Sequence, residues 1–320
     1  MNRFHLFISF LAALALAASC TEASSPEGYR TIQDIVYAQP GAKPLKYDAY
    51  IPDGARNLPG IVIIHGGGWI SNTEDMMGGL AREFVKDGKY VVFSIDYRWL
   101  GKGDGDEVAN TMDQLIEDCF GAILHIRRHA RKYGLDPDNI AVTGGSTGAH
   151  LAACMITLIE RIGDEGFGAK PGVYQYLPTY KPRQMSLSRA REELARSIKA
   201  AAPSYGVFDA KNLLRFAPGF PLTCVVAIAP DNNIPPVAQR AVPQYILLGS
   251  LDRGVQREPI EAYVDHLHAA GQRAELVIVE GAEHAFFDWD PDQPAPEAFT
   301  QFGIPYAAEI LRFFDETFYK

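Results

Sequence analysis

A strand-like run, a glycine-rich turn and a helix-like run follow one another at residues 139–160. The turn reads Gly-Gly-Ser-Thr-Gly, and Ser146 stands at its centre. A Gly-x-Ser-x-Gly pattern between a buried strand and a helix is typical of the nucleophile elbow of serine hydrolases. The glycines are needed because the turn is so tight that larger side chains would clash. The motif predicts a reactive hydroxyl on Ser146 at the carboxyl end of a strand. Glycine and serine are common in loops, so the interpretation depends on partners elsewhere in the chain.

Strand and helix patterns alternate along the rest of the chain. We expect an opening hairpin at 31–38 and 45–51, then strands at 61–64, 90–95, 139–143, 198–203, 244–248 and 274–279, and helices at 79–87, 111–133, 149–160, 186–200, 258–269 and 298–317. The runs at 61–64 and 90–95 are short and nearly all apolar, as expected when both faces of a sheet are covered. The alternation predicts an α/β fold with a mostly parallel sheet flanked by helices.

One segment, at about residues 161–197, interrupts this alternation. It is rich in Gly, Pro and Tyr and is too short for a separate domain. We therefore expect a single domain over residues 31–320, with this segment as a short cap insertion above the site. Tyr174, Tyr176 and Tyr180 could stack on sugar rings or aryl acids, and they could equally be packing residues.

The first twenty residues differ in composition from the rest. A weakly positive start precedes a nearly all-apolar run at 4–18, and small residues lead to Cys20. The pattern is too short for a transmembrane helix and predicts a signal peptide over 1–19. The residues before Cys20 resemble a bacterial lipobox, which predicts lipidation at Cys20 and a tether over 20–30. Ordinary signal cleavage and a buried N-terminal helix are the alternatives. We expect an exported protein that contacts membranes only through this anchor, or otherwise a periplasmic or secreted one.

Charge and cysteine spacing exclude several classes of site. A net charge of −9 lacks the basic footprint of a nucleic-acid-binding protein. Cys119, Cys154 and Cys224 have no metal-ligand spacing, and we expect free thiols. No glycine-rich phosphate loop or metal cluster occurs, so we expect neither a cofactor nor a metal.

Three further candidates follow predicted strands. Asp252 comes after the strand at 244–248, His284 after that at 274–279, and a His-Gly-Gly-Gly-Trp run starts at His65. Functional groups gather at the carboxyl ends of parallel strands. The order Ser146, Asp252, His284 is the order of nucleophile, acid and base expected for this kind of elbow. Imidazole must take the proton of a serine hydroxyl during attack, and a carboxylate must hold the imidazole tautomer.

Backbone amides complete the predicted chemistry. Attack on a carbonyl creates an oxyanion, which free N–H groups can stabilise by roughly 3–4 kcal/mol each. Glycines let the chain come close enough, and the N–H of Thr147, which follows the nucleophile, should contribute.

Several motifs together resemble the esterase/lipase group of α/β-hydrolases. They are residues 65–69, 96–98, 133–137, 144–150, 249–252 with Val255, and 281–286. The chain is particularly similar to the bacterial bifunctional feruloyl and acetylxylan esterases, and to hormone-sensitive-lipase-like carboxylesterases. The resemblance implies an α/β-hydrolase fold, an oxyanion hole that includes Gly67 and Gly68, and a bracing role for His65. Thr147 replaces the more common alanine. Trp99-Leu-Gly after residues 96–98 favours the polysaccharide esterases.

Other residues near the predicted site have less support. His150 lies one helical turn after Ser146, so we expect it to pack rather than to react. Asp288 and Asp290 could replace Asp252, but they follow His284 in the chain.

The leading functional hypothesis is a serine ester hydrolase acting through an acyl-enzyme on small or aromatic acyl esters of carbohydrate, such as acetyl or feruloyl esters. The alternatives are a formamidase-like amide hydrolase and a catalytically idle surface lipoprotein.

Overall fold

The computed structural model describes residues 27–163, 176–216 and 222–320. The predicted signal peptide, Cys20 and Tyr174 lie outside the described residues. Within them, no helix has the length and apolar character needed to cross a membrane.

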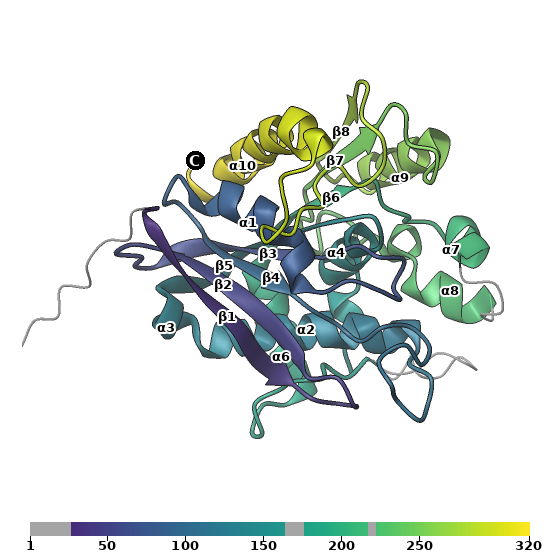
Figure 1. Ribbon diagram of the computed structural model, residues 1–320. Coiled ribbons are helices and arrows are strands. Elements are labelled where there is room, and N and C mark those ends of the chain that lie inside the picture. The colour runs from purple at the N-terminus through teal and green to yellow at the C-terminus, as the bar shows by residue number, and fades with distance from the viewer. Residues whose placement is uncertain (1–26, 164–175, 217–221) are drawn as a thin grey trace, which may run out of the picture.

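Eight strands of the described chain form one sheet in the order β1-β2-β4-β3-β5-β6-β7-β8 (Figure 1). Their bounds are β1 Tyr29–Ala38, β2 Leu45–Pro52, β3 Leu58–Ile64, β4 Val91–Ile95, β5 Leu135–Gly145, β6 Ile198–Ser204, β7 Gln244–Gly249 and β8 Ala274–Val279. The first two strands form an antiparallel hairpin, and β2 pairs antiparallel with β4. All later pairs are parallel. The predicted mostly parallel sheet is therefore confirmed, and each predicted strand is present.

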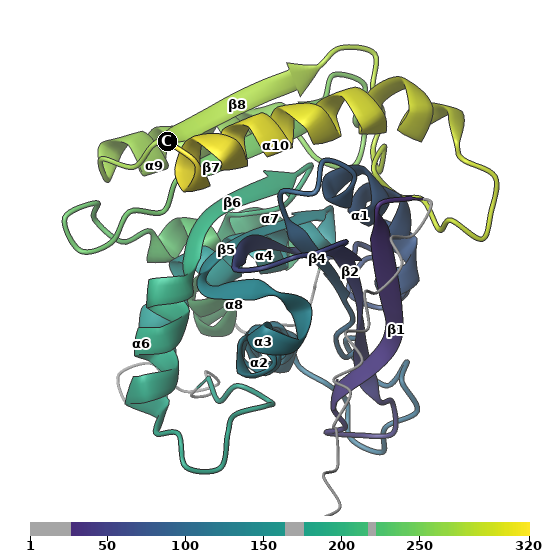
Figure 2. The same cartoon turned by 90° about the vertical axis from the view of Figure 1, so that its left-hand side faces the viewer.

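Helices cover both faces of this sheet (Figure 2). Their bounds are α1 Gly78–Val85, α2 Met112–Arg128, α3 Ala130–Tyr133, α4 Thr147–Thr157, α6 Leu187–Ser197, α7 Ala210–Phe216, α8 Leu222–Ile228, α9 Arg257–Ala269 and α10 Ile304–Phe318, with short turns η1 Glu74–Met77, η2 Ile159–Arg161, η3 Pro230–Asn233 and η4 Phe299–Gly303. Helices α1 and α10 pack together on one face, and α2, α4 and α6 lie on the other. Because both faces are covered, Ile61 to Ile64 of β3 are fully buried.

Two helix boundaries differ from the sequence prediction. The predicted helix at 111–133 is interrupted at His129, which has φ −106° and ψ 13°. The ring Nδ1 of His129 donates to the carbonyl of His125 at 2.9 Å, and α3 then ends at Gly134, as predicted. The predicted closing helix begins instead with the π-turn Phe299–Gly303 before α10.

The described residues of the predicted cap insertion do not lie over the pocket at Ser146. Residues 176–180 are clamped onto α2: the Leu177 N–H donates to Glu117 Oε1 at 2.8 Å, and the Thr179 hydroxyl donates to Asp118. Tyr176 is fully buried and Tyr180 packs edge-on to His125 at 4.8 Å, so both are packing residues. Helix α6 then leads directly into β6.

The segment that approaches Ser146 is instead the connection between β6 and β7. It carries α7 and α8, which stand at the right of Figure 1 and were not predicted. Val207 and Phe216 of this connection line the same pocket as Ser146. None of the described residues of the 161–197 segment lines that pocket.

A buried ion pair generates a stability prediction. Arg98 and Asp118 are both buried, and the guanidinium donates to the two carboxylate oxygens at 2.7 and 2.8 Å. Asp118→Ala leaves the Arg98 charge buried without its partner, so we expect a loss of about 3–5 kcal/mol in the free energy of unfolding. The exposed pair Arg257–Glu261 on α9 provides the control. Glu261→Ala should cost less than about 0.5 kcal/mol. Urea unfolding of both variants measures the difference, and equal losses would contradict the prediction.

Candidate functional site

Ser146 occupies a strained turn between β5 and α4. Its φ is +55° and its ψ −119°, a conformation that a residue with a side chain rarely adopts. Such a conformation costs about 1–3 kcal/mol and persists only where the surroundings enforce it. A Cβ on Gly148 would collide with the carbonyl oxygen of Ile64, and a Cβ on Gly144 would come within 2.5 Å of it. The two glycines therefore let the turn pack directly against the end of β3.

The structure brings Ser146, His284 and Asp252 into one hydrogen-bonded row. His284 Nε2 lies 2.9 Å from Ser146 Oγ, and His284 Nδ1 lies 2.7 Å from Asp252 Oδ2. Nδ1–H donates to the carboxylate, so Nε2 is left to accept the serine proton. The three residues follow β5, β8 and β7, three strands that are distant in sequence and close in the sheet.

The surroundings of Asp252 keep it ionised. Its side chain is fully buried, which by itself would raise the carboxyl pKa. The hydrogen bond from His284 and those from the backbone N–H groups of Val255 and Gly254, at 2.9 and 2.8 Å, outweigh burial and lower the pKa. The carboxylate therefore stays charged at pH values where an ordinary Asp begins to protonate. A charged Asp252 is what holds the His284 tautomer and stabilises an imidazolium.

The glycine loop after β3 passes over the elbow. Gly67, Gly68 and Trp69 have φ values of +112°, +66° and +64° in succession. Gly68 and Thr147 line the same pocket as Ser146, and the Trp69 N–H donates to the Thr147 hydroxyl at 3.4 Å. Gly67 instead shapes the turn, since its carbonyl accepts from the Ser71 hydroxyl at 2.8 Å. The two predicted halves of an oxyanion hole thus meet beside Ser146.

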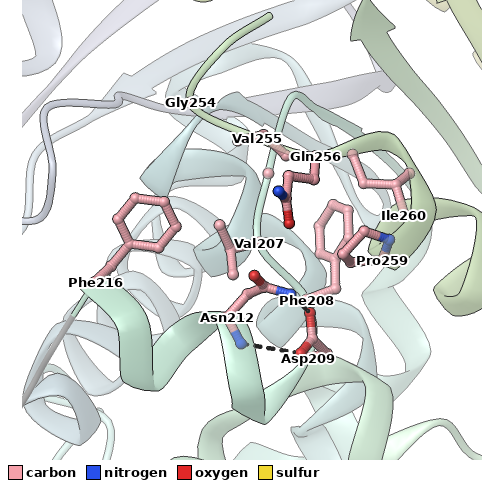
Figure 3. Close-up of a pocket in the computed structure, with 11 residues that line it drawn as sticks. Val207, Phe208, Asp209, Asn212, Phe216, Gly254, Val255, Gln256, Pro259 and Ile260 are labelled. Atoms are coloured by element: carbon pink, nitrogen blue, oxygen red, sulfur yellow. Dashed lines mark hydrogen bonds between the residues drawn. The ribbon is translucent and has the colours of Figure 1, made fainter.

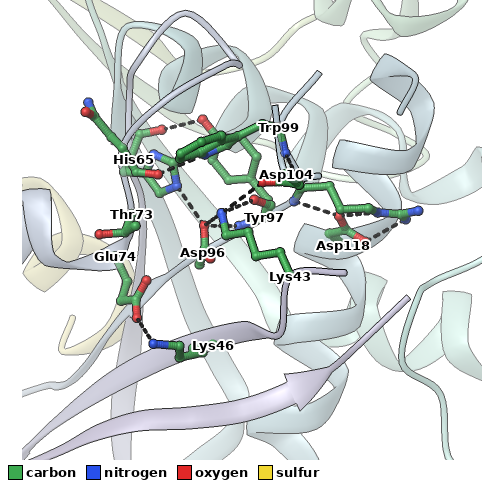
Figure 4. A network of polar contacts seen from close by, with 12 residues as sticks. Lys43, Lys46, His65, Thr73, Glu74, Asp96, Tyr97, Trp99, Asp104 and Asp118 are labelled. Atoms are coloured by element: carbon green, nitrogen blue, oxygen red, sulfur yellow. Dashed lines mark hydrogen bonds and ion pairs between the residues drawn. The ribbon is translucent and has the colours of Figure 1, made fainter. Parts of the chain in front are cut away.

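A buried polar network braces this loop (Figure 4). His65 is fully buried, its ring stacks on Tyr97 at 4.2 Å, and its Nε2 lies 3.2 Å from Asp96 Oδ1. Lys43 donates to the same Asp96 oxygen at 2.8 Å and lies 4.6 Å over the Trp99 ring. His65 therefore supports the loop without facing Ser146. Lys43 lies in no motif, so the sequence carried no signal for its part in the network.

Apolar side chains enclose the space in front of Ser146. The pocket has a volume of about 150 Å³ and is lined by Gly68, Trp69, Ser146, Thr147, Val207, Phe216, Gly254, Val255 and His284. It shares four of these residues, Val207, Phe216, Gly254 and Val255, with a smaller hollow of about 10 Å³ (Figure 3). In Figure 3 the polar ends of Asp209 and Asn212 meet in that hollow, joined by a 2.8 Å hydrogen bond. The space in front of Ser146 is large enough for a small acyl group.

The less supported candidates lie outside this row. His150 is fully buried, its Nε2 donates to the Ile228 carbonyl at 3.2 Å, and burial lowers its pKa to about 4. Asp288 contacts Tyr205, while Asp290 accepts from a nearby backbone N–H in its own turn. The carboxylate hydrogen-bonded to His284 is that of Asp252.

Cysteines and metal ligands add no second centre to the part of the chain that is described. Cys119 and Cys154 are buried and form no disulfide. No cluster of three or more His, Cys, Asp or Glu side chains suited to a metal ion occurs among residues 27–163, 176–216 and 222–320.

Known proteins are similar to this chain in sequence and in fold. Probable isoprenylcysteine α-carbonyl methylesterase ICMEL1 of Arabidopsis thaliana is 24% identical over 258 residues, covering 77% of this chain and 50% of that protein. The chain thus spans about half the length of this plant relative. Carboxylesterase NlhH of Mycobacterium tuberculosis is 25% identical over 282 residues, covering 85% of this chain and 81% of that protein.

Solved structures and a family profile agree with these relatives. Thermogutta terrifontis esterase 2, phosphoramylated by tabun, has a TM-score of 0.65 at 25% identity, covering 92% of this chain and 97% of that one. The native structure of that esterase has a TM-score of 0.64 at 24% identity, covering 90% and 91% of the two chains. The BD-FAE family profile matches residues 47–212, just over half of the chain. The chain therefore belongs to the BD-FAE family and has the α/β-hydrolase fold.

Proposed function

We propose that the chain is a serine carboxylesterase in which Ser146 is the nucleophile, His284 the general base and Asp252 the supporting carboxylate. The observation that carries this proposal is the unbroken row of hydrogen bonds from Ser146 Oγ through His284 to Asp252, at the wall of a closed-in pocket. Carboxylesterase and methylesterase relatives support the same reaction class.

The reaction has two halves. In the first, Ser146 Oγ attacks the ester carbonyl while His284 Nε2 takes its proton. The N–H groups of Gly68 and Thr147 stabilise the oxyanion, and the imidazolium then protonates the leaving alcohol. In the second half His284 activates a water molecule, which releases the acid from Ser146. No cofactor is required for either half.

The size of the pocket favours short acyl groups. Trp69, Val207, Phe216 and Val255 close the 150 Å³ space around Ser146, so acetyl and propionyl groups fit the enclosed volume better than long chains. A structure of Thermogutta terrifontis esterase 2 with propionate bound agrees with this choice. The resemblance to feruloyl and acetylxylan esterases extends the proposal to small or aromatic acyl groups on carbohydrate.

Two other functions give different outcomes in the same assays. An amide hydrolase would use the same three residues, so it is distinguished by its substrates. A catalytically idle surface lipoprotein would lack a working nucleophile, whereas Ser146 here is hydrogen-bonded to its base. Labelling of the folded protein by a fluorophosphonate probe separates this second alternative from an active hydrolase.

The first prediction concerns the nucleophile and the substrate. Wild-type protein should hydrolyse p-nitrophenyl acetate, and Ser146→Ala should lose at least about 10⁴-fold in kcat because no acyl-enzyme can form. A panel of acetyl, butyryl, octanoyl and feruloyl esters, with acetylated xylan included, should show faster turnover of acetyl than of octanoyl esters. Equal turnover by wild type and Ser146→Ala would disprove the assignment. Faster cleavage of a matched anilide would favour the amidase.

A second prediction isolates the carboxylate. Asp252→Asn keeps the size of the side chain but favours the wrong tautomer of His284, so kcat should fall roughly 10³- to 10⁴-fold. Asp290→Asn is the matched control, because Asp290 lies outside the hydrogen-bonded row. It should change kcat by less than about twofold. Steady-state rates on p-nitrophenyl acetate decide, and comparable losses in the two variants would contradict the role of Asp252.

We also propose that the chain is exported and lipidated at Cys20, as its leader predicts. A lipobox cysteine carries several acyl chains, which together exceed the two signals needed for stable membrane anchoring. Because β1 begins at Tyr29, the tether between the lipid and the catalytic domain would run over residues 20–28 and not to residue 30.

The corresponding prediction concerns fractionation. Cys20→Ser should move the protein to the soluble fraction or leave its leader uncleaved, because the lipid attachment site is gone. Membrane fractionation and intact mass measure this. An unlipidated mature N-terminus in the wild type would contradict the anchor and leave the esterase proposal unaffected.

A further inference from the structure

Tyr205 lies between the loop that carries His284 and the turn that carries Ser146. Ser146 follows β5 and His284 follows β8, so the histidine loop reaches Ser146 past the carboxyl ends of β7 and β6. Tyr205 is the first residue after β6 and is fully buried. Its φ of +45° is a strained value for a residue with a large side chain. The backbone therefore holds this ring in place at a conformational cost.

The histidine loop, residues 284–288, contacts both the ring and the hydroxyl of Tyr205. The ring of Tyr205 lies 5.0 Å from the imidazole of His284, at 62°, and 4.9 Å from the ring of Phe286. Its hydroxyl accepts from the Phe287 N–H at 3.3 Å and faces Asp288 Oδ1 at 3.5 Å. Ring and hydroxyl thus contact both the imidazole and the backbone that carries it.

The same hydroxyl also reaches the nucleophile elbow. A Cβ on Gly145 would lie 2.5 Å from Tyr205 Oη, so the phenol fills the space beside the residue preceding Ser146. The Ser146 N–H donates to the carbonyl of Ser204, the residue before Tyr205, at 3.0 Å. One side chain therefore touches the two segments whose separation sets the distance between His284 and Ser146.

We propose that Tyr205 is a positioning residue for the reaction, holding the imidazole of His284 at hydrogen-bonding distance from Ser146. This inference rests on the proposed esterase function. A misplacement of about 1 Å in such a pair can cost 10²-fold in rate. The edge-on ring limits the tilt of the imidazole, and the hydroxyl ties the loop at Phe287 and Asp288 to the elbow.

The polar groups around the hydroxyl are consistent with this role. Burial raises the pKa of Tyr205 well above its usual value, so the phenol stays neutral and can both donate and accept. Burial also raises the pKa of Asp288 to about 6. The phenol is the hydrogen-bonding group that faces this carboxyl group across 3.5 Å.

The test removes only the hydroxyl. Tyr205→Phe keeps the ring and should lower kcat on p-nitrophenyl acetate roughly 10- to 100-fold, with KM changed by less than about twofold, because imidazole placement affects chemistry more than substrate binding. Tyr245→Phe is the matched control, since Tyr245 is a buried tyrosine of β7 that stacks on Phe313 at 5.4 Å, away from the pocket. It should change neither constant.

A double-mutant cycle adds a readout that a merely structural role would not move. If the hydroxyl and Asp288 act through one contact, the losses in kcat for Tyr205→Phe and Asp288→Ala should not add in the double variant. Thermal melting and fluorophosphonate titration confirm that equal amounts of folded, labelled protein are compared.

Two outcomes would overturn the inference on Tyr205. One is a Tyr205→Phe variant that melts earlier yet keeps the wild-type kcat per labelled site; the other is a loss confined to KM. In both, wild-type turnover leaves the esterase proposal standing. A wild type that neither labels nor turns over any ester overturns the esterase proposal and this inference together.

Discussion

The close packing of the elbow against the end of β3 is the constraint on which the rest of the site depends. Gly144 and Gly148 allow the turn to pack against the carbonyl of Ile64, and Ser146 between them has a φ of +55° and a ψ of −119°. Helix α4 then starts at Thr147, and the glycine loop after β3 passes directly above. A side chain on either glycine would push the two segments apart, and the serine hydroxyl and the loop amides would no longer share one pocket.

A network of polar side chains supports the glycine loop that follows β3. In the loop from Gly67 to Trp69 the two glycines adopt positive φ values freely, whereas the φ of +64° at Trp69 persists only when neighbouring groups enforce it. His65, Asp96 and Lys43 form the hydrogen-bonded network that supports this loop (Figure 4). Burying these groups is costly unless they are paired, and here each has an oppositely polarised partner. The opening hairpin, which carries Lys43, is thereby linked to the geometry at Ser146.

Part of the pocket wall comes from a segment other than those that carry Ser146, Asp252 and His284. Val207 and Phe216 belong to the connection between β6 and β7, whereas the described part of the 161–197 segment packs on α2. The same connection begins with Tyr205, which contacts the histidine loop. Residues that line the pocket and the residue that contacts the imidazole therefore belong to one connection.

Local patterns in the sequence determined the class of fold and selected the side chains that we propose react. The central parallel strands could be predicted from short apolar runs, and Ser146, Asp252 and His284 could be chosen because each follows such a run in the expected order. The interruption at His129 could not be predicted, because it depends on a side chain bonding back to its own helix. The location of the cap and the roles of Lys43 and Tyr205 were decided by tertiary structure alone. Their contacts join residues far apart in the chain, such as Lys43 with Asp96 and Tyr205 with His284, and contacts of that kind leave no periodicity or motif in the sequence.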